Sequence, residues 1–415
     1  METYDKYKPS GIDWIGEVPE HWEIKKVSWL FTIGSGTTPS TSNKEYYAEE
    51  GINWLQTGDL NDGVIRQTSK KITQKALDDC RLTLYPSNSL VVAMYGATIG
   101  KVGLLDIETT TNQACCVLYN SKVNTQFAYY TFLADKTNLI TESYGGGQPN
   151  ISQEKIKSQR IACPPLAEQE AIAAYLDARC ADIDKVVATQ EKRIALLQEL
   201  KQSEITQAVT RGLNPDARMK DSGVEWIGMV PEHWEKCRFK DFITLVTKPS
   251  LSETKIGLEN IESGTGRFIE TDSEFEGNGV EFFENDVVYG KLRPYLQKVW
   301  LATFKGNAVG DFFVFREKKN SCSHYLKYLM LSDGFTKEAD GATVGAKMPR
   351  VSSDFILTMR YYLPNRDEQV EIAEYLDRRC GEIDKQIGAV TKQIELLREY
   401  KQALITEVVT GKRRV

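Results

Sequence analysis

The chain contains two copies of one unit. Residues 10–23 (SGIDWIGEVPEHWE) are identical to residues 222–235 (SGVEWIGMVPEHWE) at 11 of 14 positions, and residues 164–212 are identical to residues 364–412 at 24 of 49 positions. The first match is offset by 212 residues and the second by 200, so the stretch between them is 12 residues shorter in the second copy. This repeat restricts the fold to two similar units, each with an opening motif, a variable middle and a long closing segment.

The closing segments carry the pattern of paired helices. Apolar residues recur at alternating spacings of four and three with charged residues elsewhere, which is typical of a coiled-coil seam. Pro164 and Pro364 stand just before the pattern, where a proline is compatible with a helix start. The seam positions are Leu176, Cys180, Ile183, Val187, Gln190, Ile194 and Leu197 in the first copy, and Leu376, Cys380, Ile383, Ile387, Val390, Ile394 and Leu397 in the second. One helix cannot bury its own seam, so we expect the two helices to pair; packing of each helix on its own domain is the alternative.

The variable middles are rich in short β-type runs bounded by Gly, Asn and Thr clusters. The clearest runs are Ser89–Met94, Ala114–Tyr119, Asp286–Tyr289 and Asp311–Phe315. Tyr95–Gly96 follows one run as Tyr289–Gly290 follows another, which suggests one fold with divergent surfaces. We therefore predict an α+β fold: a tandem duplication of a globular α+β domain followed by a long helix, with the two helices forming an antiparallel coiled coil of pseudo-two-fold symmetry.

The repeat also predicts the domain boundaries. The first domain with its N-terminal arm covers residues 1–163, and its helix covers 164–210. A linker at 211–221, containing Gly212 and Pro215, precedes the second domain with its opening arm at 222–363. The second helix covers residues 364–415.

Composition narrows the function. Fifty-two basic and 58 acidic residues give a formal charge of −6, so any nucleic-acid surface has to be local. No apolar run approaches the roughly 20 residues that span a bilayer, and the polar start METYDKYKPS does not resemble a secretory signal. Eight cysteines without a CxxC pair favour free thiols in a cytoplasmic protein, and the presence of only three histidines argues against a His-rich metal site. We expect no membrane partner and no metal.

Catalytic signatures are missing from the sequence. Residues 96–101 (GATIGK) have three residues between the glycines where a phosphate loop needs four, and Val102 stands where Ser or Thr is required. Asn214–Pro215 is followed by Asp216, so it is not the Asn-Pro-Pro-aromatic motif of amino-methyltransferases. No histidine is obviously paired with a nucleophile. We expect no catalytic residue and no cofactor bound by this chain.

The repeated tryptophans have two interpretations. Trp14 and Trp22, with their copies Trp226 and Trp234, could form an aromatic platform for bases. We favour the structural interpretation, in which each pair packs an extended arm onto its domain.

Candidate DNA-contacting residues lie in polar loops and in a basic stretch. Residues 34–40 and 145–152 of the first copy are rich in Gly, Thr and Gln, which permits close backbone approach to DNA. In the second copy, seven carboxylates in 270–286 are followed by a mostly basic run through Lys319, and such segregation can place a basic face beside an acidic one. The candidates are Thr37, Thr38, Lys101, Gln113, Gln148 and Asn150 in the first copy, and Lys248, Lys291, Arg293, Lys347 and Arg350 in the second.

The order of these motifs resembles a known family. A WIGxVPEHW motif, a variable domain, a PPLxEQ-type junction and a long helix, all used twice, are similar to the specificity subunit of Type I restriction–modification systems. The most specific parts are Trp14–Trp22 and Glu168–Lys185 with their copies. Asn365 replaces the second proline of the junction in the second copy.

The resemblance implies a function. The middles would be target recognition domains that read the two halves of a bipartite site in double-stranded DNA, and the helices would be conserved spacers that set the gap and dock partners. The implied partners are methyltransferase subunits, two of them, which bind S-adenosylmethionine, and a restriction subunit with motor and nuclease activity. This chain would supply sequence recognition and no chemistry.

Two other functions stay open on the residues alone. The chain could be a coiled-coil interaction scaffold without sequence-specific DNA binding, although two middles of one fold and very different residue content argue against simple spacers. It could also be an enzyme in its own right, which binding of S-adenosylmethionine to the purified chain would indicate.

Overall fold

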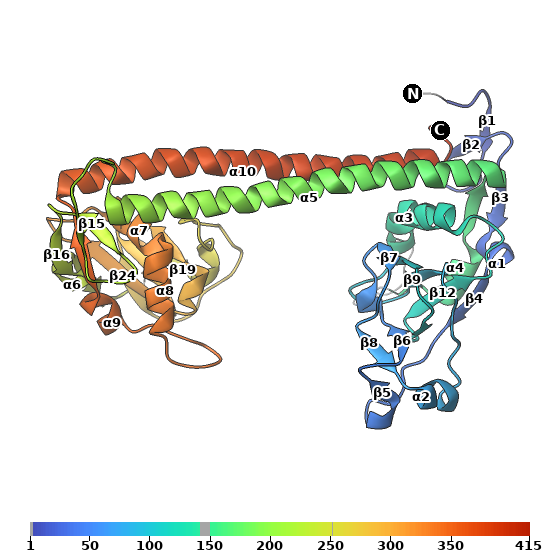
Figure 1. Ribbon diagram of the computed structural model, residues 1–415, viewed down its shortest axis with the longest axis horizontal. Helices are drawn as coiled ribbons and strands as arrows, with labels where there is room; N and C mark the ends of the chain where they lie inside the picture. The colour runs from blue at the N-terminus through green and yellow to red at the C-terminus, as the bar shows by residue number, and fades with distance from the viewer. Residues whose placement is uncertain (1–2, 142–149, 251) are drawn as a thin grey trace. The chain divides into compact units, whose positions relative to one another are not determined.

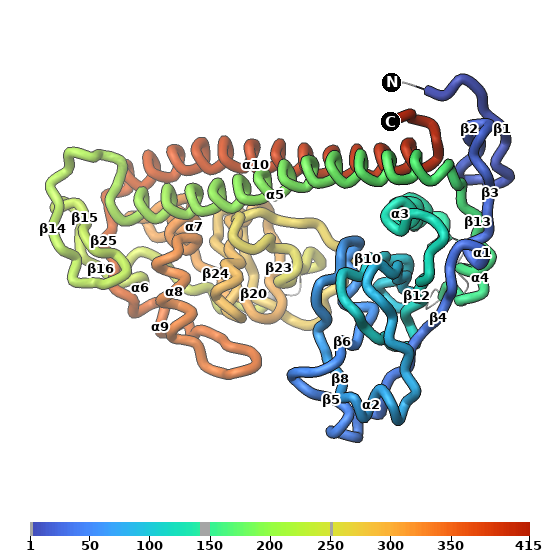
Figure 2. The backbone as a smooth tube through the Cα atoms, turned by 45° about the vertical axis from the view of Figure 1, so that its right-hand side comes forward, coloured from blue at the N-terminus to red at the C-terminus, as the bar shows by residue number. Residues whose placement is uncertain are grey.

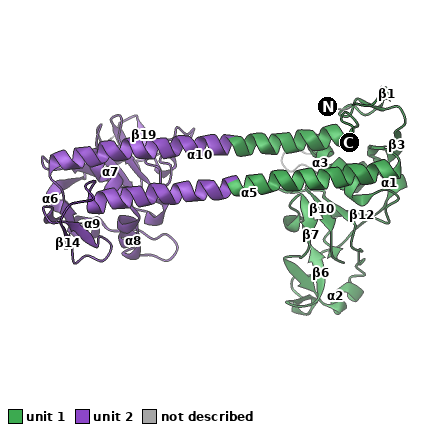
Figure 3. Cartoon of the chain, turned by 45° about the horizontal axis from the view of Figure 1, so that its top comes forward, with its two compact units in different colours: residues 1–189, 393–415 green, residues 190–392 purple. Residues whose placement is uncertain are grey.

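The computed structural model describes residues 3–141, 150–250 and 252–415. The chain forms two compact units, one made of residues 1–189 with 393–415 and the other of residues 190–392 (Figure 3). Each unit holds one globular domain together with a part of each long helix. The domain boundaries that the repeat predicts stay a prediction. Each compact unit includes a part of both long helices, so the units do not follow the order of the sequence.

The first unit contains two sheets and a short arm. The arm is the antiparallel pair β1 (Tyr7–Pro9) and β2 (Glu17–Pro19). The five-stranded sheet has the order β4 (Thr32–Ser35), β12 (Cys115–Tyr119), β9 (Leu90–Ala93), β10 (Val102–Leu105) and β7 (Gly63–Ile65). The four-stranded sheet has the order β11 (Thr110–Thr111), β6 (Ile52–Leu55), β8 (Lys70–Ile72) and β5 (Tyr47–Ala48). A further pair joins β3 (Glu23–Lys26) to β13 (Arg160–Cys163), and the helices are α1 (Val27–Leu30), α2 (Gln74–Asp79), α3 (Thr125–Thr141), α4 (Gln153–Ser158) and α5 (Leu166–Arg211).

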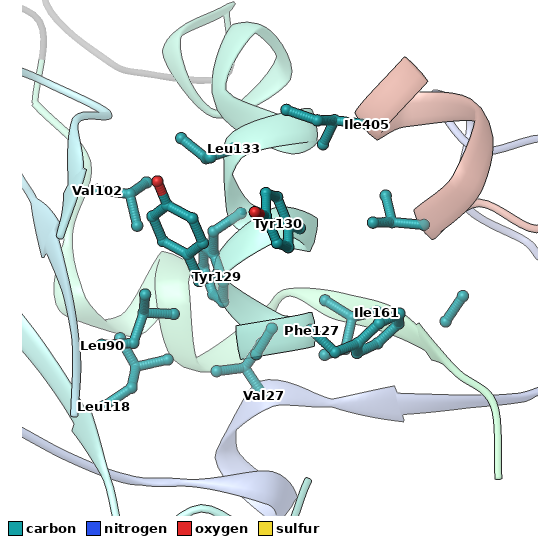
Figure 4. Close-up of a cluster of buried hydrophobic side chains, with 14 of the residues drawn as sticks. Val27, Leu90, Val102, Leu118, Phe127, Tyr129, Tyr130, Leu133, Ile161 and Ile405 are labelled. Carbon is teal, nitrogen blue, oxygen red and sulfur yellow. The ribbon is translucent and has the colours of Figure 1, made fainter. Parts of the chain in front are cut away.

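The core of the first unit lies around α3 (Figure 4). Phe127 and Tyr130 of α3 are buried among Leu90 and Leu118 of the larger sheet and Ile405 of the second long helix. The continuous apolar composition of β9 and β12 fits strands that are buried on both faces. The end of α10 (Arg366–Val409) is thus part of the core of the first unit.

The second unit repeats this arrangement. Its arm is β14 (Met219–Asp221) with β15 (Met229–Pro231), and β16 (Glu235–Arg238) pairs with β25 (Arg360–Leu363). One four-stranded sheet has the order β17 (Ile243–Val246), β24 (Phe312–Glu317), β21 (Val287–Gly290) and β22 (Val299–Leu301). The other has the order β18 (Pro249–Ser250), β20 (Gly279–Phe282), β23 (Gly306–Ala308) and β19 (Lys255–Ile256). The helices are α6 (Phe239–Phe242), α7 (Ser323–Leu331), α8 (Asp333–Gly341), α9 (Ser353–Thr358) and α10.

The long helices run antiparallel within each unit (Figure 1). In the first unit the ammonium of Lys401 lies 2.7 Å from both carboxylate oxygens of Asp184. In the second unit the ammonium of Lys201 lies 2.9 Å from both oxygens of Asp384. These are the same two repeat positions with the copies exchanged, as the predicted antiparallel pairing of the duplicated helices requires. The predicted fold class is therefore confirmed.

Every expected seam position is buried or half-buried, whereas most of the positions between them are exposed. The buried positions are Leu176, Cys180, Val187, Leu376, Cys380, Ile383, Val390 and Ile394, and the half-buried ones are Ile183, Gln190, Ile194, Leu197, Ile387 and Leu397. The neighbours of the seam on the helix surface carry the charge, which is the distribution that a paired helix needs.

The predicted strand runs are present, but one correspondence between the copies was wrong. Ala93 pairs with Cys115 in the first unit as Gly290 pairs with Phe312 in the second. Gly290 therefore corresponds to Ala93 inside the strand, and Tyr289–Gly290 ends β21, whereas Tyr95–Gly96 lies beyond β9. The shared Tyr-Gly dipeptide aligns Gly290 with Gly96, whereas the strand pairing aligns Gly290 with Ala93, three residues earlier.

Several chemical expectations can be examined across the described residues. All eight cysteines are free thiols. No helix in the described ranges combines the length and apolar character needed to cross a membrane. Within the same ranges, no group of three or more His, Cys, Asp and Glu side chains is placed to hold a metal ion.

Candidate nucleic-acid interface

The repeated tryptophans anchor the arms through one carboxylate in each unit. The indole nitrogen of Trp22 donates to Glu168 at 3.1 Å, and that of Trp234 donates to Glu368 at 3.0 Å. The imidazole Nε2 of His21 lies 2.9 Å from the other oxygen of Glu168, and His233 repeats this contact with Glu368 at 2.9 Å. Trp22 and Trp234 are buried, so neither is available to stack on a base. For these two tryptophans, the interpretation in which they attach the arm to its domain holds.

The glutamine next to each carboxylate joins the helix to its domain. Gln169 accepts from the backbone N–H of Asn124 at 2.9 Å and donates to the carbonyl of Pro164 at 2.8 Å. Gln369 accepts from the N–H of Cys322 and donates to the carbonyl of Pro364 at the same distances. The repeated Glu-Gln pair thus fixes the arm and the domain to the start of each long helix.

Three backbone hydrogen bonds form the same frame at the end of the central strand of each domain. In the first unit, Ala93 donates to the carbonyl of Lys101 (2.9 Å), Met94 donates to that of Ala114 (2.8 Å), and Ile151 donates to that of Met94 (2.7 Å).

The second unit repeats this frame. Gly290 donates to the carbonyl of Lys298 (2.7 Å), Lys291 donates to that of Asp311 (2.9 Å), and Val351 donates to that of Lys291 (3.1 Å). Lys101 corresponds to Lys298 on this frame, whereas Met94 and Ala114 are replaced by Lys291 and Asp311. One scaffold thus carries different side chains in the two units.

The first unit brings most of its candidate residues to this frame. Thr38 donates to the side-chain carbonyl of Gln113 at 2.6 Å, and both side chains are exposed. Asn150 is exposed and forms a backbone bridge with Tyr95, while half-buried Lys101 closes the turn from β9 to β10. Thr37 is exposed nearby, and Gln148 lies outside the described residues.

That turn also settles the character of the glycine-rich segment at 96–101. It connects two antiparallel strands, β9 and β10, with Gly96 and Gly100 at positive φ. A phosphate loop instead leads from a strand into a helix N-terminus, so the local fold agrees with the sequence argument against a nucleotide site.

The second unit gathers its candidates around Asp311. The guanidinium of Arg350 donates to both carboxylate oxygens of Asp311 at 2.9 Å, and the ammonium of Lys291 lies 3.8 Å from it and over the ring of Phe313. These hydrogen bonds and charges, led by the bond from Arg350, lower the pKa of Asp311, so the carboxylate stays ionised at neutral pH. Arg293 has an exposed side chain, and its backbone N–H donates to the carbonyl of Pro349 at 2.8 Å.

Two other candidates on the second unit have no hydrogen bond or ion pair with Asp311 within the described residues. Lys347 is exposed in the loop between α8 and α9, close in sequence to Arg350. Lys248 lies apart from the Asp311 group, and its ammonium is 2.9 Å from the carboxylate of Glu281.

Two carboxylates of the acidic stretch in the second unit pair with cations of the basic run. Arg316 donates to both oxygens of Asp286 at 2.7 and 2.6 Å, and Lys305 lies 3.6 Å from Glu281. Lys298 is turned inward, where its ammonium donates to two backbone carbonyls and burial lowers its pKa. These charges are far apart in the sequence and meet because β20 pairs with β23 and β21 pairs with β24.

Sequence reasoning missed three features of these surfaces. Asp311 organises the cations of the second unit, yet in the sequence it only interrupts a basic run. A groove of about 560 Å³ in the first unit is lined in part by Thr41, Tyr47, Lys70 and Lys71. The loop between α8 and α9 exposes the apolar side chains of Val344 and Met348. In the sequence, the only signal of this apolar surface was the presence of these two residues near Lys347.

Comparison with known proteins supports one family. Residues 19–197 match the model of the Type I restriction modification DNA specificity domain. The chain is 24% identical to the MjaVIII specificity subunit of Methanocaldococcus jannaschii, with 96% of this chain and 94% of that protein covered. It is 26% identical to the EcoKI specificity subunit of Escherichia coli, with 95% and 90% covered.

Solved structures share the fold. A structure described as showing complex assembly and conformational transition of the type I R-M system matches with a TM-score of 0.71 at 15% identity, over 94% of this chain and 98% of that chain. The HsdS subunit from Thermoanaerobacter tengcongensis matches with a TM-score of 0.51 at 16% identity, over 95% and 98%. The duplicated domains with their arm anchors and paired helices thus define a specificity-subunit architecture. The chain is similar to Type I restriction–modification specificity subunits over almost its whole length, and residues 19–197 match their DNA specificity domain, which agrees with the resemblance found in its sequence.

Proposed function

We propose that this chain is the non-catalytic DNA-recognition subunit of a Type I restriction–modification complex. Each unit reads one half of a bipartite target in double-stranded DNA. The observation that carries the proposal is the shared frame at the end of β9 and β21, where identical backbone hydrogen bonds support different side chains. A protein that reads two different half-sites with one fold needs this combination, since base edges are distinguished by side chains and not by the scaffold.

A DNA-binding surface has to contact phosphates for position and base edges for sequence, and the surfaces on the frame suit both tasks. Thr38, Gln113 and Asn150 in the first unit offer donors and acceptors for base edges. Arg293 and Lys347 in the second unit offer exposed cations for phosphates or guanine. The acidic net charge is compatible with this function because the cations are local.

Partner docking through the helices is part of the same proposal. Leu196 and Leu200 on α5, and Leu396 and Tyr400 on α10, occupy equivalent repeat positions and lie off the seam. Leu196 is 65% exposed and Leu396 is 52% exposed. Large exposed apolar side chains at the same place in both copies fit two equivalent protein partners, which we propose to be methyltransferase subunits. These partners would bind S-adenosylmethionine and flip the target adenine out of the duplex, and a restriction subunit would complete the complex.

A genome-wide map of adenine methylation tests the proposal. The chain is expressed with its methyltransferase partner in cells that otherwise lack the modification. We expect a new split motif, with two short specific parts separated by unread bases, that disappears when this chain is omitted. If the partner is soluble and bound to the chain but no new motif arises, the chain is an interaction scaffold and the proposal fails.

A further inference from the structure

The loop between α8 and α9 presents an apolar tip to solvent. It extends away from the body of the second unit (Figure 2). Val344 is 81% exposed and Met348 is 46% exposed, and Ala346 between them is exposed as well. Val344 has the largest exposed fraction among the large apolar side chains in the described residues. Packing within the domain does not account for a tip of this composition.

The backbone of this loop is closed and attached to the frame. Val344 and Arg350 exchange two backbone hydrogen bonds of 3.0 and 3.1 Å, which form a small hairpin. Leu292 and Arg350 form a second bridge, and Gly345 turns the tip at a φ of +105°. The tip is therefore held in one shape before any ligand binds.

Cations surround the apolar tip. Arg293 and Lys347 are exposed, and neither forms an ion pair within the described part of the chain. Arg350, at the base of the hairpin, and Lys291 both contact Asp311. Tyr295, two residues after Arg293, is 53% exposed. An apolar centre with a cationic border fits the DNA major groove, where phosphates flank base edges and the thymine C5 methyl is the apolar group on those edges.

We propose that Val344 and Met348 read thymine methyl groups in the major groove of the half-site bound by the second unit. This inference rests on the proposed function and adds the chemistry that its second module recognises. Arg293 and Lys347 position the tip through phosphates, and the two apolar side chains supply the discrimination. A contact with one methyl group favours thymine over a base without it by about three- to fivefold.

Replacement of thymine by deoxyuridine isolates this contact, since it removes only the methyl group. The full chain in complex with its methyltransferase partner is titrated with duplexes that carry the motif from the methylation map, at fixed salt. Each thymine in the second half-site is replaced in turn, and binding is followed by fluorescence anisotropy. We expect about three- to fivefold weaker binding at one or more positions for the wild-type chain, and a loss of this preference in V344A/M348A.

Two controls accompany this measurement. Deoxyuridine in the half-site of the first unit should affect the wild type and V344A/M348A equally. Ile269→Ala removes an apolar side chain of the second unit that is 41% exposed, similar to Met348, and should keep the thymine preference. Since Val344 and Met348 are exposed, the double variant is expected to fold.

Two results would overturn the inference while the proposed function stands. One is a second half-site without any A·T pair. The other is a wild-type chain that binds thymine and deoxyuridine duplexes equally at every position; if V344A/M348A then weakens both duplexes alike, the tip acts as an apolar wedge between base steps. If no motif appears in the methylation map, the proposed function fails first and this inference fails with it.

Discussion

Single carboxylates decide how the arms attach. Glu168 accepts from the indole of Trp22 and the hydroxyl of Tyr4 and contacts His21. Glu368 repeats the tryptophan and histidine contacts in the second unit. A buried indole N–H without an acceptor costs about 1–3 kcal/mol, so the bond from the tryptophan is one way in which each glutamate stabilises its unit.

Replacing these carboxylates should destabilise the units. We expect Glu168→Ala and Glu368→Ala each to lower the free energy of unfolding by about 1–3 kcal/mol, because Trp22 or Trp234 loses its acceptor. Glu170→Ala, an exposed position on the same helix, is the matched control. Urea denaturation measures the difference, and equal stability of Glu168→Ala and Glu170→Ala would show that the contact contributes nothing.

Arg293 and Lys291 allow DNA binding to be separated from packing. Arg293 is exposed and carries no ion pair in the described residues, whereas Lys291 is half-buried against Asp311 and Phe313. We expect Arg293→Ala to weaken DNA binding through the second module without loss of stability, and Lys291→Ala to weaken it less. Binding titrations at several salt concentrations measure this, since loss of one phosphate contact reduces the salt slope by about one unit. Unchanged affinity and slope in both variants would remove them from the interface.

At the scale of elements, the duplication places the same Asp–Lys pair in two different environments along the paired helices, so the two pairs can be compared. Lys201 is only 8% exposed, and its ammonium faces Asp384, which also binds Arg267 at 2.8 Å. In the equivalent pair, Asp184 is 60% exposed and Lys401 is 29% exposed. The same two residue types at the same repeat positions therefore have different energetic roles.

Removing the two aspartates should show this difference. We expect Asp384→Asn to destabilise the chain by about 3 kcal/mol, because it leaves a buried ammonium without its counterion. Asp184→Asn should cost less than about 1 kcal/mol, as an exposed pair does. Thermal unfolding of the two variants side by side provides the comparison, and equal losses would contradict the assignment by burial.

The exposed apolar pairs on the helices give a second prediction at this scale. We expect Leu196→Glu with Leu396→Glu to reduce copurification of the methyltransferase partner at least tenfold, because a charge would be buried at the interface. Val186→Glu, at an exposed apolar position on α5 that has no apolar counterpart in the second copy, is the control. Retention of the partner by the double variant would place docking elsewhere.

At the scale of the whole molecule, each long helix belongs to both units. Helix α5 begins at the arm anchor of the first unit, and Gly212 beyond its end lies against Trp234 and Glu368 of the second. Helix α10 begins at Glu368, and Gly411 beyond its end lies against Pro19 and Trp22. Both glycines have positive φ, which suits the left-handed residue that ends a helix.

Exchange of one variable domain tests the two-module function. Replacing residues 24–163 with the corresponding segment of another family member keeps the arm anchors and both helices. We expect the methylation motif to change in one half only, because the second frame and its side chains are untouched. A motif that changes in both halves would contradict independent reading by the two units.

The sequence determined the elements and their repetition. Identity of the opening and closing segments revealed the duplication, the 4-3 spacing predicted both helices, and the β-type runs at Ser89–Met94 and Ala114–Tyr119 predicted strands that are present. These features are local or periodic, so they are visible along one dimension. The family followed from the same repeated motifs.

Only the tertiary structure decided which charges meet and which helix halves share a core. Asp286 and Arg316 are 30 residues apart in sequence, and Asp311 and Arg350 are 39 apart, and only the fold brings each pair together. The division of α5 and α10 between the two units depends on antiparallel contacts such as Asp184 with Lys401. The apolar tip at Val344 became visible only when its exposure was known. Contacts at long sequence separation leave no periodic signal, because the fold, and not the spacing of residues, brings their partners together.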